Sequence, residues 1–180
     1  MAINAGIFGD TTSLEHRYIP DYERLGELVV YWKKLGLRVV LTSGTFDLFH
    51  FGHVSFLKKC KRIADKVVVG LNTDDFIERF KGSKPILTYK ERYQSLNECK
   101  YVDEILKNEC GEDSKPVILS THPTIIAVGD DWAHKDYFKQ MSFTQMWLDD
   151  NQITLVYIPY TKGISASEIK KRVIENKETA

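Results

Sequence analysis

The chain has 180 residues, and its 25 Lys and Arg balance its 25 Asp and Glu, so the formal net charge is zero. This length favours one domain with a real hydrophobic core, and the neutral balance excludes a general basic field for nucleic acid. No apolar run approaches the roughly 20 residues that span a membrane, and the first ten residues do not resemble a signal peptide. Cys60, Cys99 and Cys110 form no C-x-x-C pair, so we expect no structural disulfide or zinc site and a cytoplasmic location.

The N-terminal segment, residues 1–37, is predicted to be an arm and a helix that pack on a main domain of residues 38–180. Residues 1 to about 20 show no periodicity and are expected to be irregular. From Asp21 onward, apolar residues keep helical spacing, and Gly36 is placed to end the helix. The helical positions are Leu25, Leu28, Val29, Trp32 and Leu35.

A strand, a short loop and a helix are predicted next. The β-branched run at 38–42 is typical of a buried strand, and apolar residues from Phe56 to Ala64 recur with helical spacing. His50 and His53 lie where this helix begins, three residues apart and therefore on one face. A helix N-terminus attracts phosphate through its unpaired N–H groups and its dipole, and Gly52 lacks a side chain that would keep an anion away.

These residues carry a family resemblance. Gly44-Thr45-Phe46-Asp47 followed by His50-Phe51-Gly52-His53 resembles the H-x-G-H signature of the nucleotidyltransferase superfamily, which includes cytidylyltransferases, adenylyltransferases and class I aminoacyl-tRNA synthetases. The resemblance implies that His50 and His53 act on the transferred phosphoryl group, while Thr45, Phe46 and Gly52 contact the nucleotide. Two alternatives remain: ordinary capping residues, or a metal pair, although no residue is assigned to a metal.

A second buried strand is predicted at 66–71, and residues 72–75 open a short helix. The loop 80–85 holds Lys81 and Lys84, which are either solvated charges or, as the resemblance implies, phosphate contacts. Thr88 to Glu91 form a capping box that begins another helix. Residues 100–105 resemble a family strand in which Lys100 replaces an arginine. The resemblance assigns Lys84 to catalysis, and it assigns Lys81, Arg92 and Lys100 to the acceptor phosphate.

A clean buried strand at 125–128 ends in Gly129-Asp130-Asp131-Trp132, at the edge where open parallel sheets bind ligands. This tetrapeptide resembles the glycerol-phosphate cytidylyltransferases, in which the residue matching Asp131 is implicated in cytosine recognition. An aspartate-rich turn is the alternative. Residues 135–148, rich in aromatic side chains and Met, are predicted to form a core or dimer-facing helix, and the last strand is expected at 153–158.

The C-terminal helix begins with a stretch that has two compatible interpretations. Ser165 and Glu168 match a capping box, which is a complete structural account. The stretch also resembles the family's second signature, whose hydroxyl and N–H groups bind the outer phosphates. This resemblance assigns five residues to the nucleotide: Thr161, Gly163, Ile164, Ser165 and Ser167. Tyr160 stands where the family usually has arginine, and Lys162 offers a replacement cation.

Five strands alternating with helices predict an α/β, Rossmann-like, doubly wound parallel sheet in a single domain. The resemblance implies a cytidylyltransferase that transfers CMP from CTP, with Mg²⁺ on the triphosphate, to a small phosphorylated alcohol such as glycerol 3-phosphate. Pyrophosphate leaves, and the CDP-alcohol would serve as a precursor of cell-surface polymers. A homodimer is expected, without nucleic-acid or membrane partners. The alternatives are an adenylyltransferase acting on a sugar phosphate, which the leading helix favours, and a non-catalytic nucleotide sensor, which Tyr160 favours.

Overall fold

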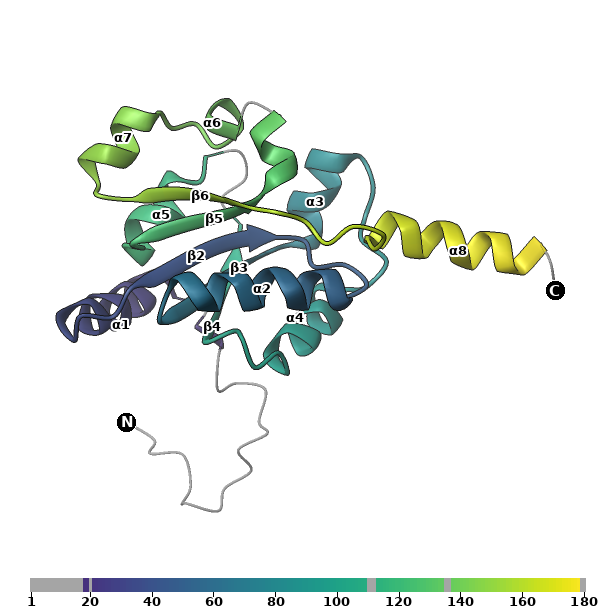
Figure 1. Ribbon diagram of the computed structural model, residues 1–180, viewed down its shortest axis with the longest axis horizontal. Helices are drawn as coiled ribbons and strands as arrows, with labels where there is room; N and C mark the ends of the chain where they lie inside the picture. Colours follow the sequence, from purple (N-terminus) through teal and green to yellow (C-terminus); the bar gives the residue numbers. More distant parts are fainter. Residues whose placement is uncertain (1–17, 20, 110–112, 135–136, 179–180) are drawn as a thin grey trace, which may run out of the picture.

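The computed structural model describes residues 18–19, 21–109, 113–134 and 137–178, and these contain one six-stranded sheet (Figure 1). The strand order is β1-β4-β3-β2-β5-β6, and every neighbouring pair is parallel. The predicted Rossmann-like α/β fold is therefore confirmed. The strands are β1 (Tyr18–Ile19), β2 (Val39–Gly44), β3 (Lys66–Asn72), β4 (Glu104–Asn108), β5 (Ile125–Gly129) and β6 (Thr154–Ile158).

Helices cover both faces of the sheet, so its strands are continuous apolar runs rather than alternating ones. Val67 and Val69 face one core together with α2 and α4, whereas Val68 faces the other core together with α1, α5 and α7. The helical elements are α1 (Tyr22–Lys34), α2 (Phe51–Ile63), α3 (Asp74–Lys81), α4 (Tyr89–Asn97), α5 (Lys115–Thr121), η2 (Asp130–His134), α6 (Tyr137–Gln140), α7 (Gln145–Asp150) and α8 (Ala166–Glu178).

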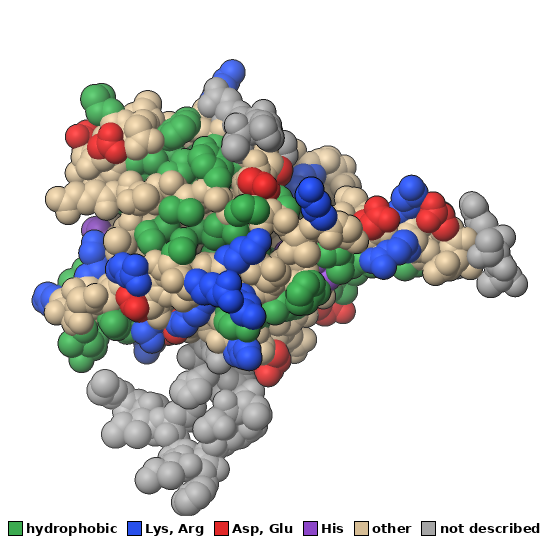
Figure 2. Space-filling view, viewed as in Figure 1, with side chains coloured by type: hydrophobic (Ala, Val, Ile, Leu, Met, Phe, Trp, Pro, Cys, Tyr) green, Lys and Arg blue, Asp and Glu red, His purple; other side chains and the backbone are tan. Residues whose placement is uncertain are grey.

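The last helix, α8, projects away from the sheet (Figure 1). Neither buried core includes a residue beyond Ile158, so α8 adds little to the interior. Figure 2 shows Lys and Arg side chains gathered over α2 on one face of the molecule, where the sequence places Lys58, Lys59, Lys61 and Arg62. Although the net charge is zero, the charged side chains are therefore unevenly distributed over the surface.

The direction of the chain through the sheet reverses beside β2. From β2 the chain moves outward through β3 to β4, and it then returns to place β5 on the other side of β2. Such a reversal leaves a crevice between the carboxyl ends of β2 and β5, where open α/β sheets bind ligands. Gly44 and Gly129 end these two strands and border this crevice.

Two predicted elements differ in the structure. The strand expected at 100–105 begins only at Glu104, because the chain first turns, with the Val102 N–H donating to the Cys99 carbonyl (3.0 Å). The Val67 N–H of the neighbouring strand then donates to the Asp103 carboxylate (2.8 Å) rather than to a backbone carbonyl. The single helix expected at 135–148 is instead two short helices, because the chain turns at Ser142 with a φ of 57°.

The N-terminal segment is also more regular than predicted near its end. Tyr18 and Ile19 form the short strand β1, which pairs with β4 through Ile105 and Leu106. Residues 1–17, predicted to be irregular, lie outside the described part of the chain. The helix predicted from Asp21 is confirmed as α1, with Asp21 as its N-cap and Gly36 in the left-handed conformation just beyond it.

Candidate active site

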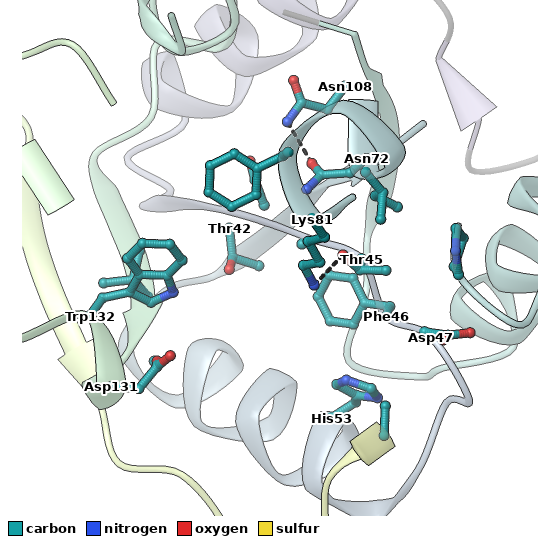
Figure 3. Close-up of a pocket in the computed structure, with 18 of the residues that line it drawn as sticks. Thr42, Thr45, Phe46, Asp47, His53, Asn72, Lys81, Asn108, Asp131 and Trp132 are labelled. Carbon is teal, nitrogen blue, oxygen red and sulfur yellow. Dashed lines mark hydrogen bonds between the residues drawn. The ribbon is translucent and has the colours of Figure 1, made fainter. Parts of the chain in front are cut away.

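A cavity of about 650 Å³ lies at the carboxyl edge of the sheet (Figure 3). Its wall combines the ends of β2, β3, β4 and β5 with the first turns of α2 and α8 and with the α3 region. The residues predicted from sequence to act here that do lie on the wall are Thr45, Phe46, His50, Gly52, His53, Lys81, Lys84, Asp131 and Ser167.

The two histidines cap α2 with their own side chains. His50 Nδ1 accepts a hydrogen bond from the Gly52 N–H (3.1 Å), and His53 Nδ1 accepts one from the His50 N–H (3.4 Å). The two rings stack with their centroids 3.9 Å apart. Because each Nδ1 is an acceptor, the proton of each neutral imidazole must be on Nε2. The cap therefore fixes both tautomers with Nε2–H as the outward donor.

Both imidazoles are neutral at physiological pH. Burial lowers the pKa of His50, and burial together with the neighbouring His50 lowers the pKa of His53 to about 3, against a smaller opposing effect of Asp47. A neutral ring cannot attract phosphate as a cation. The pair instead offers N–H donors beside the positive end of a helix.

Gly52 also has a packing role that was not predicted from the sequence. A Cβ at this position would lie 2.8 Å from the His50 ring and 3.2 Å from Ile164 Cγ2. The space beside Gly52 is thus filled by these two side chains. Glycine lets α8 and the capping histidine approach the start of α2, in addition to placing Gly52 on the cavity wall.

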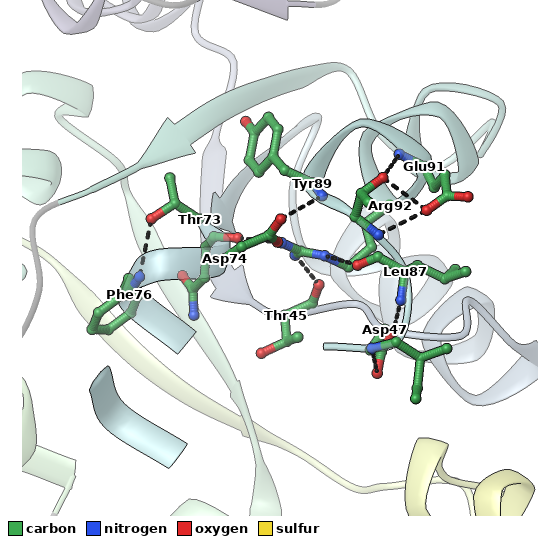
Figure 4. Close-up of polar contacts among 12 residues, drawn as sticks. Thr45, Asp47, Thr73, Asp74, Phe76, Leu87, Tyr89, Glu91 and Arg92 are labelled. Carbon is green, nitrogen blue, oxygen red and sulfur yellow. Dashed lines mark hydrogen bonds and ion pairs between the residues drawn. The ribbon is translucent and has the colours of Figure 1, made fainter. Parts of the chain in front are cut away.

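Asp47 joins three segments around the cavity (Figure 4). Its buried carboxylate accepts from the backbone N–H groups of Ile86 and Leu87, both at 3.0 Å, and pairs with Lys170 of α8 at 3.2 Å. Burial alone would raise the pKa of Asp47, but these hydrogen bonds and Lys170 lower it overall. The neighbouring Phe46 and Leu48 have φ values of 51° and 46°, so the loop after β2 is strained.

Arg92 does not lie where the resemblance placed it. Its side chain is fully buried, and its guanidinium donates to the carbonyls of Leu87, Thr45 and Asn72 and pairs with Asp74 (Figure 4). These four partners engage four of the five N–H donors of the guanidinium. The expectation that Arg92 binds an acceptor phosphate is therefore wrong in this structure.

Lys100 is also misplaced by the resemblance. It lies in the turn between α4 and β4, near the amino end of β4, and its ammonium lies 5.3 Å from the centre of the Tyr101 ring. The cavity lies at the opposite, carboxyl edge of the same parallel strands. Lys100 therefore cannot contact a ligand in the cavity of its own chain.

The two loop lysines do reach the cavity. Lys81 Nζ donates to Thr45 Oγ1 (3.3 Å) and points to the middle of the cavity in Figure 3. Lys84 is 3.5 Å from Glu78 and largely exposed, so it lies at the cavity mouth. Both cations therefore border the space that the histidines face.

The C-terminal signature is only partly at the wall. Ser165 caps α8 by accepting from the Glu168 N–H (3.0 Å), which is one of the two hydrogen bonds of the predicted capping box. Among the described residues, the wall includes Ser167 and Lys170 but not Thr161, Gly163, Ile164 or Ser165. Lys170 was missed from sequence because only the fold brings it beside Asp47.

Tyr160 occupies the corner beside Asp131. Its ring lies against Gly129, where a Cβ would be 2.3 Å away, and its N–H donates to the Asp130 carboxylate (3.0 Å). Burial, the two aspartates and a hydrogen bond to Asp131 raise the pKa of Tyr160 to about 12. The phenol thus stays protonated and donates to Asp131. Sequence reasoning identified Tyr160 as a departure from the family but not as a partner of Asp131.

In the part of the chain that the structure describes, no three His, Cys, Asp or Glu side chains are grouped to hold a metal ion. No described helix is both long and apolar enough to cross a membrane.

A phosphate-attracting helix start, neutral histidine donors and lysines around one crevice of a doubly wound sheet define a nucleotidyltransferase. Comparison with known proteins agrees with this class. The chain belongs to the cytidylyltransferase-like family, whose model matches residues 41–172, and it is therefore an enzyme of the nucleotidyltransferase class.

Three examples illustrate the range of proteins to which this chain is similar. Glycerol-3-phosphate cytidylyltransferase of Bacillus subtilis (strain 168) is 34% identical over 138 residues, which cover 76% of this chain and 98% of that protein. Bifunctional protein HldE of Aliarcobacter butzleri (strain RM4018) is 28% identical over 167 residues, covering 92% of this chain but 33% of HldE. A crystal structure of the lipopolysaccharide core biosynthesis protein from Thermoplasma volcanium GSS1 has a TM-score of 0.57 and 27% identity, covering 72% of this chain and all of that one.

Proposed function

We propose that the protein transfers CMP from CTP to the phosphate of a small phosphorylated alcohol, with glycerol 3-phosphate as the first candidate. The observation that carries this proposal is the convergence of the His50 and His53 Nε2–H donors with Lys81 and Lys170 on one cavity. The match to a glycerol-3-phosphate cytidylyltransferase over nearly its whole length supports the choice of nucleotide and acceptor.

The proposed reaction is an in-line displacement. A phosphate oxygen of the acceptor attacks the α-phosphorus of CTP, a new P–O bond forms, and the bond to the β-phosphate breaks to release pyrophosphate. A phosphate monoester is already a nucleophile at neutral pH, so the enzyme needs no covalent intermediate. Its tasks are to align two polyanions and to stabilise the charge that gathers on the transferred group.

The site residues divide this work in our proposal. His50 and His53 donate to the α-phosphoryl group, while Lys84 and the start of α8, with Ser165 and Ser167, hold the outer phosphates. Thr45 and Phe46 contact the nucleotide, and Asp131, held by Tyr160, reads the base amine. The segment from Thr161 to Ile164 shapes the approach to α8, and Lys81 attracts the acceptor phosphate.

Mg²⁺ would enter as part of the CTP complex. The two carboxylates on the described cavity wall are Asp47, which is bound to two N–H groups and Lys170, and Asp131, which is bound to Tyr160. They therefore do not form a resident metal site, and the ion would be held by phosphate oxygens and water.

The direct test measures pyrophosphate release with MgCTP and a panel of alcohol phosphates. We expect turnover with glycerol 3-phosphate or a related polyol phosphate. Nucleotide binding without turnover on any acceptor would overturn the proposal in favour of the sensor that Tyr160 originally suggested.

Replacing His53 by Ala tests the catalytic assignment. Loss of one transition-state donor is expected to lower kcat by about 10²–10³. His122→Asn is the matched control, because His122 lies away from the cavity and asparagine tolerates its φ of 41°. A His53→Ala variant within threefold of wild type would contradict the assignment.

Adenylyl transfer to a sugar phosphate is the second candidate. It is kept open by the alignment with HldE, a relative that is not named as a cytidylyltransferase and that aligns with 92% of this chain, whereas the Bacillus relative aligns with 76% of it. Comparing kcat/KM for MgCTP and MgATP on the same acceptor panel separates the two candidates. We expect a preference for MgCTP, and an ATP preference would reverse the assignment.

We further propose that residues 38–180 form the catalytic domain, with residues 1–37 as an accessory segment, and that the enzyme is a cytoplasmic homodimer. The unbridged thiols of Cys60 and Cys99 agree with a reducing compartment, while Cys110 lies outside the described residues. Light scattering of the purified chain tests the dimer: we expect twice the mass of 20.8 kDa.

A further inference from the structure

Part of the cavity has no role in the mechanism above. We call it the amide arm, and it consists of Ser43, Asn72 and Asn108, which lie at the carboxyl ends of the neighbouring strands β2, β3 and β4. Ser43 pairs in register with Gly70, and Asn72 pairs with Asn108, so all these positions share one face of the sheet.

Gly70 keeps this arm open. A Cβ on Gly70 would lie 2.6 Å from Ser43 Oγ and 3.7 Å from Asn108 Cβ. Any larger residue would therefore fill the space between the serine hydroxyl and the amides. The sheet here forms a polar recess where three apolar side chains would otherwise be expected.

The two amides orient each other. Asn108 Nδ2 donates to Asn72 Oδ1 at 2.7 Å, and Asn108 is 6% exposed. This bond fixes the Asn72 carboxamide so that its nitrogen faces the middle of the cavity in Figure 3. A carboxamide carries two N–H donors and two acceptor lone pairs, and a hydroxyl is both donor and acceptor. This combination matches the hydroxyl groups of a ligand, which also donate and accept.

The position of the arm relative to the charges indicates which part of a ligand it meets. In Figure 3 the Lys81 ammonium lies between the amide arm and His53. A phosphate near Lys81 would face the histidines on one side, and the carbon chain attached to it would extend toward Asn72 on the other. The arm is therefore placed for the alcohol portion of the acceptor rather than for its phosphate.

Charge argues against an amine in this recess. The acidic side chains on the described cavity wall are Asp47 and Asp131, and Figure 3 shows both on other sides of the cavity, away from Asn72 and Asn108. An ammonium group in the arm would thus lose water without gaining an ion pair, which is costly. Neutral hydroxyl groups do not have this cost.

We propose that Ser43, Asn72 and Asn108 bind the hydroxyl groups of a polyol phosphate and thereby select it over amino-alcohol phosphates. This inference rests on the proposed function, because it assigns the substrate class of that same site.

The test compares glycerol 3-phosphate, a pentitol 5-phosphate and ethanolamine phosphate as acceptors for MgCTP. We expect the wild type to use the two polyol phosphates at least tenfold more efficiently than ethanolamine phosphate. The near-isosteric Asn72→Leu is expected to raise the KM for the polyol phosphates about tenfold and leave the KM for CTP within twofold, since one lost hydrogen bond to a ligand is worth roughly 1 kcal/mol or slightly more.

Ser43→Ala provides a second variant if Asn72→Leu folds poorly. It should raise the KM for the polyol phosphates by a smaller factor and leave the KM for CTP unchanged. Asn151→Leu, on the exposed end of α7, is the control and should change neither KM. Equal use of ethanolamine phosphate by the wild type, or unchanged acceptor KM in both variants, overturns this inference alone. Absence of pyrophosphate release from CTP with every acceptor instead overturns the proposed function.

Discussion

The neutral histidine pair is the residue-scale feature on which the proposed chemistry depends. An imidazolium at a helix N-terminus would be repelled by the dipole and by its neighbour, so the fold keeps both rings uncharged. Stacking at 3.9 Å leaves no room to separate two charges. In our proposal the pair therefore acts through fixed N–H dipoles, which need no proton transfer during the reaction.

This arrangement predicts how stability depends on pH. The pKa of His53 is about 3 in the folded chain and near 6.5 when unfolded, so the unfolded state binds more protons between these values. The part of the stability that depends on neutral His53 is fully present above pH 6.5 and is lost as the pH falls toward 3. We expect His53 to account for about 2 kcal/mol of the loss of unfolding free energy between pH 7 and pH 5. Urea unfolding at the two pH values measures it.

His53→Gln should remove this part of the pH dependence, while the control His122→Asn should keep it. Asp47, whose pKa is lowered from 3.8, affects the unfolding free energy only at more acidic pH, so it does not alter the comparison between pH 7 and pH 5. An identical pH dependence in wild type and His53→Gln would mean that His53 is protonated in the native protein at pH 5.

Tyr160 gives a second residue-scale prediction. Tyr160→Phe keeps the ring against Gly129 and removes only the hydroxyl that donates to Asp131. We expect the KM for CTP to rise about three- to tenfold, with a smaller change in kcat, because the carboxylate that we propose to read the base loses its orientation. Steady-state kinetics measures both constants. Unchanged KM for CTP would show that Tyr160 does not position Asp131.

At the scale of elements, Arg92 connects α4 to the loop after β2 and to the start of α3. Its donors satisfy carbonyls of Leu87, Thr45 and Asn72, and it pairs with Asp74, so one side chain fixes three segments that border the cavity. These segments carry no backbone ladder to each other at this point. Arg92 thus takes the place of secondary structure there.

We predict that Arg92→Leu lowers the free energy of unfolding by roughly 3–5 kcal/mol, because it removes the ion pair with the partly buried Asp74 and leaves three backbone carbonyls without this donor. Denaturant titration measures the change. Arg79→Leu, on the exposed side of α3, is the control and should stay within about 0.5 kcal/mol of wild type. If Arg92→Leu were fully stable and lost only acceptor affinity, Arg92 would be a ligand contact after all.

The contrast between Arg92 and the histidines explains what the sequence could predict. His50 and His53 are placed by a local pattern of strand end, glycine and helix start, and the structure puts them where that pattern indicated. Arg92 matched a family position equally well, but its burial depends on carbonyls from segments up to 47 positions away. Local pattern does not contain that information.

The same reasoning applies to the elements. The strands β2, β3, β5 and β6 were predicted within a few residues because they are continuous apolar runs. The start of β4 was misplaced because the chain first turns between Cys99 and Val102, and the side chain of Asp103 then bonds to Val67 in a neighbouring strand. The break between α6 and α7 was missed because aromatic residues with helical spacing can pack from two short helices as well as from one.

At the scale of the whole molecule, the cavity joins the body of the sheet to α8. A bound triphosphate would contact both parts, so nucleotide binding should stabilise the folded protein. At 100 times its Kd, MgCTP is expected to add about 2.7 kcal/mol and raise Tm by roughly 5–10 °C, with a smaller shift for MgATP. Scanning fluorimetry measures this difference, and equal shifts would contradict selection of the base by Asp131.

The position of α8 has a consequence for truncation of the protein. Every described strand and every residue of the two buried cores lies at or before Ile158, whereas Ser167 and Lys170 belong to α8. A premature stop codon shortly after position 158 would keep the described interior but remove two residues of the cavity wall, one of them the lysine that pairs with the buried Asp47 carboxylate. We expect such a shortened chain to fold with reduced stability and to bind nucleotide more weakly than the full chain.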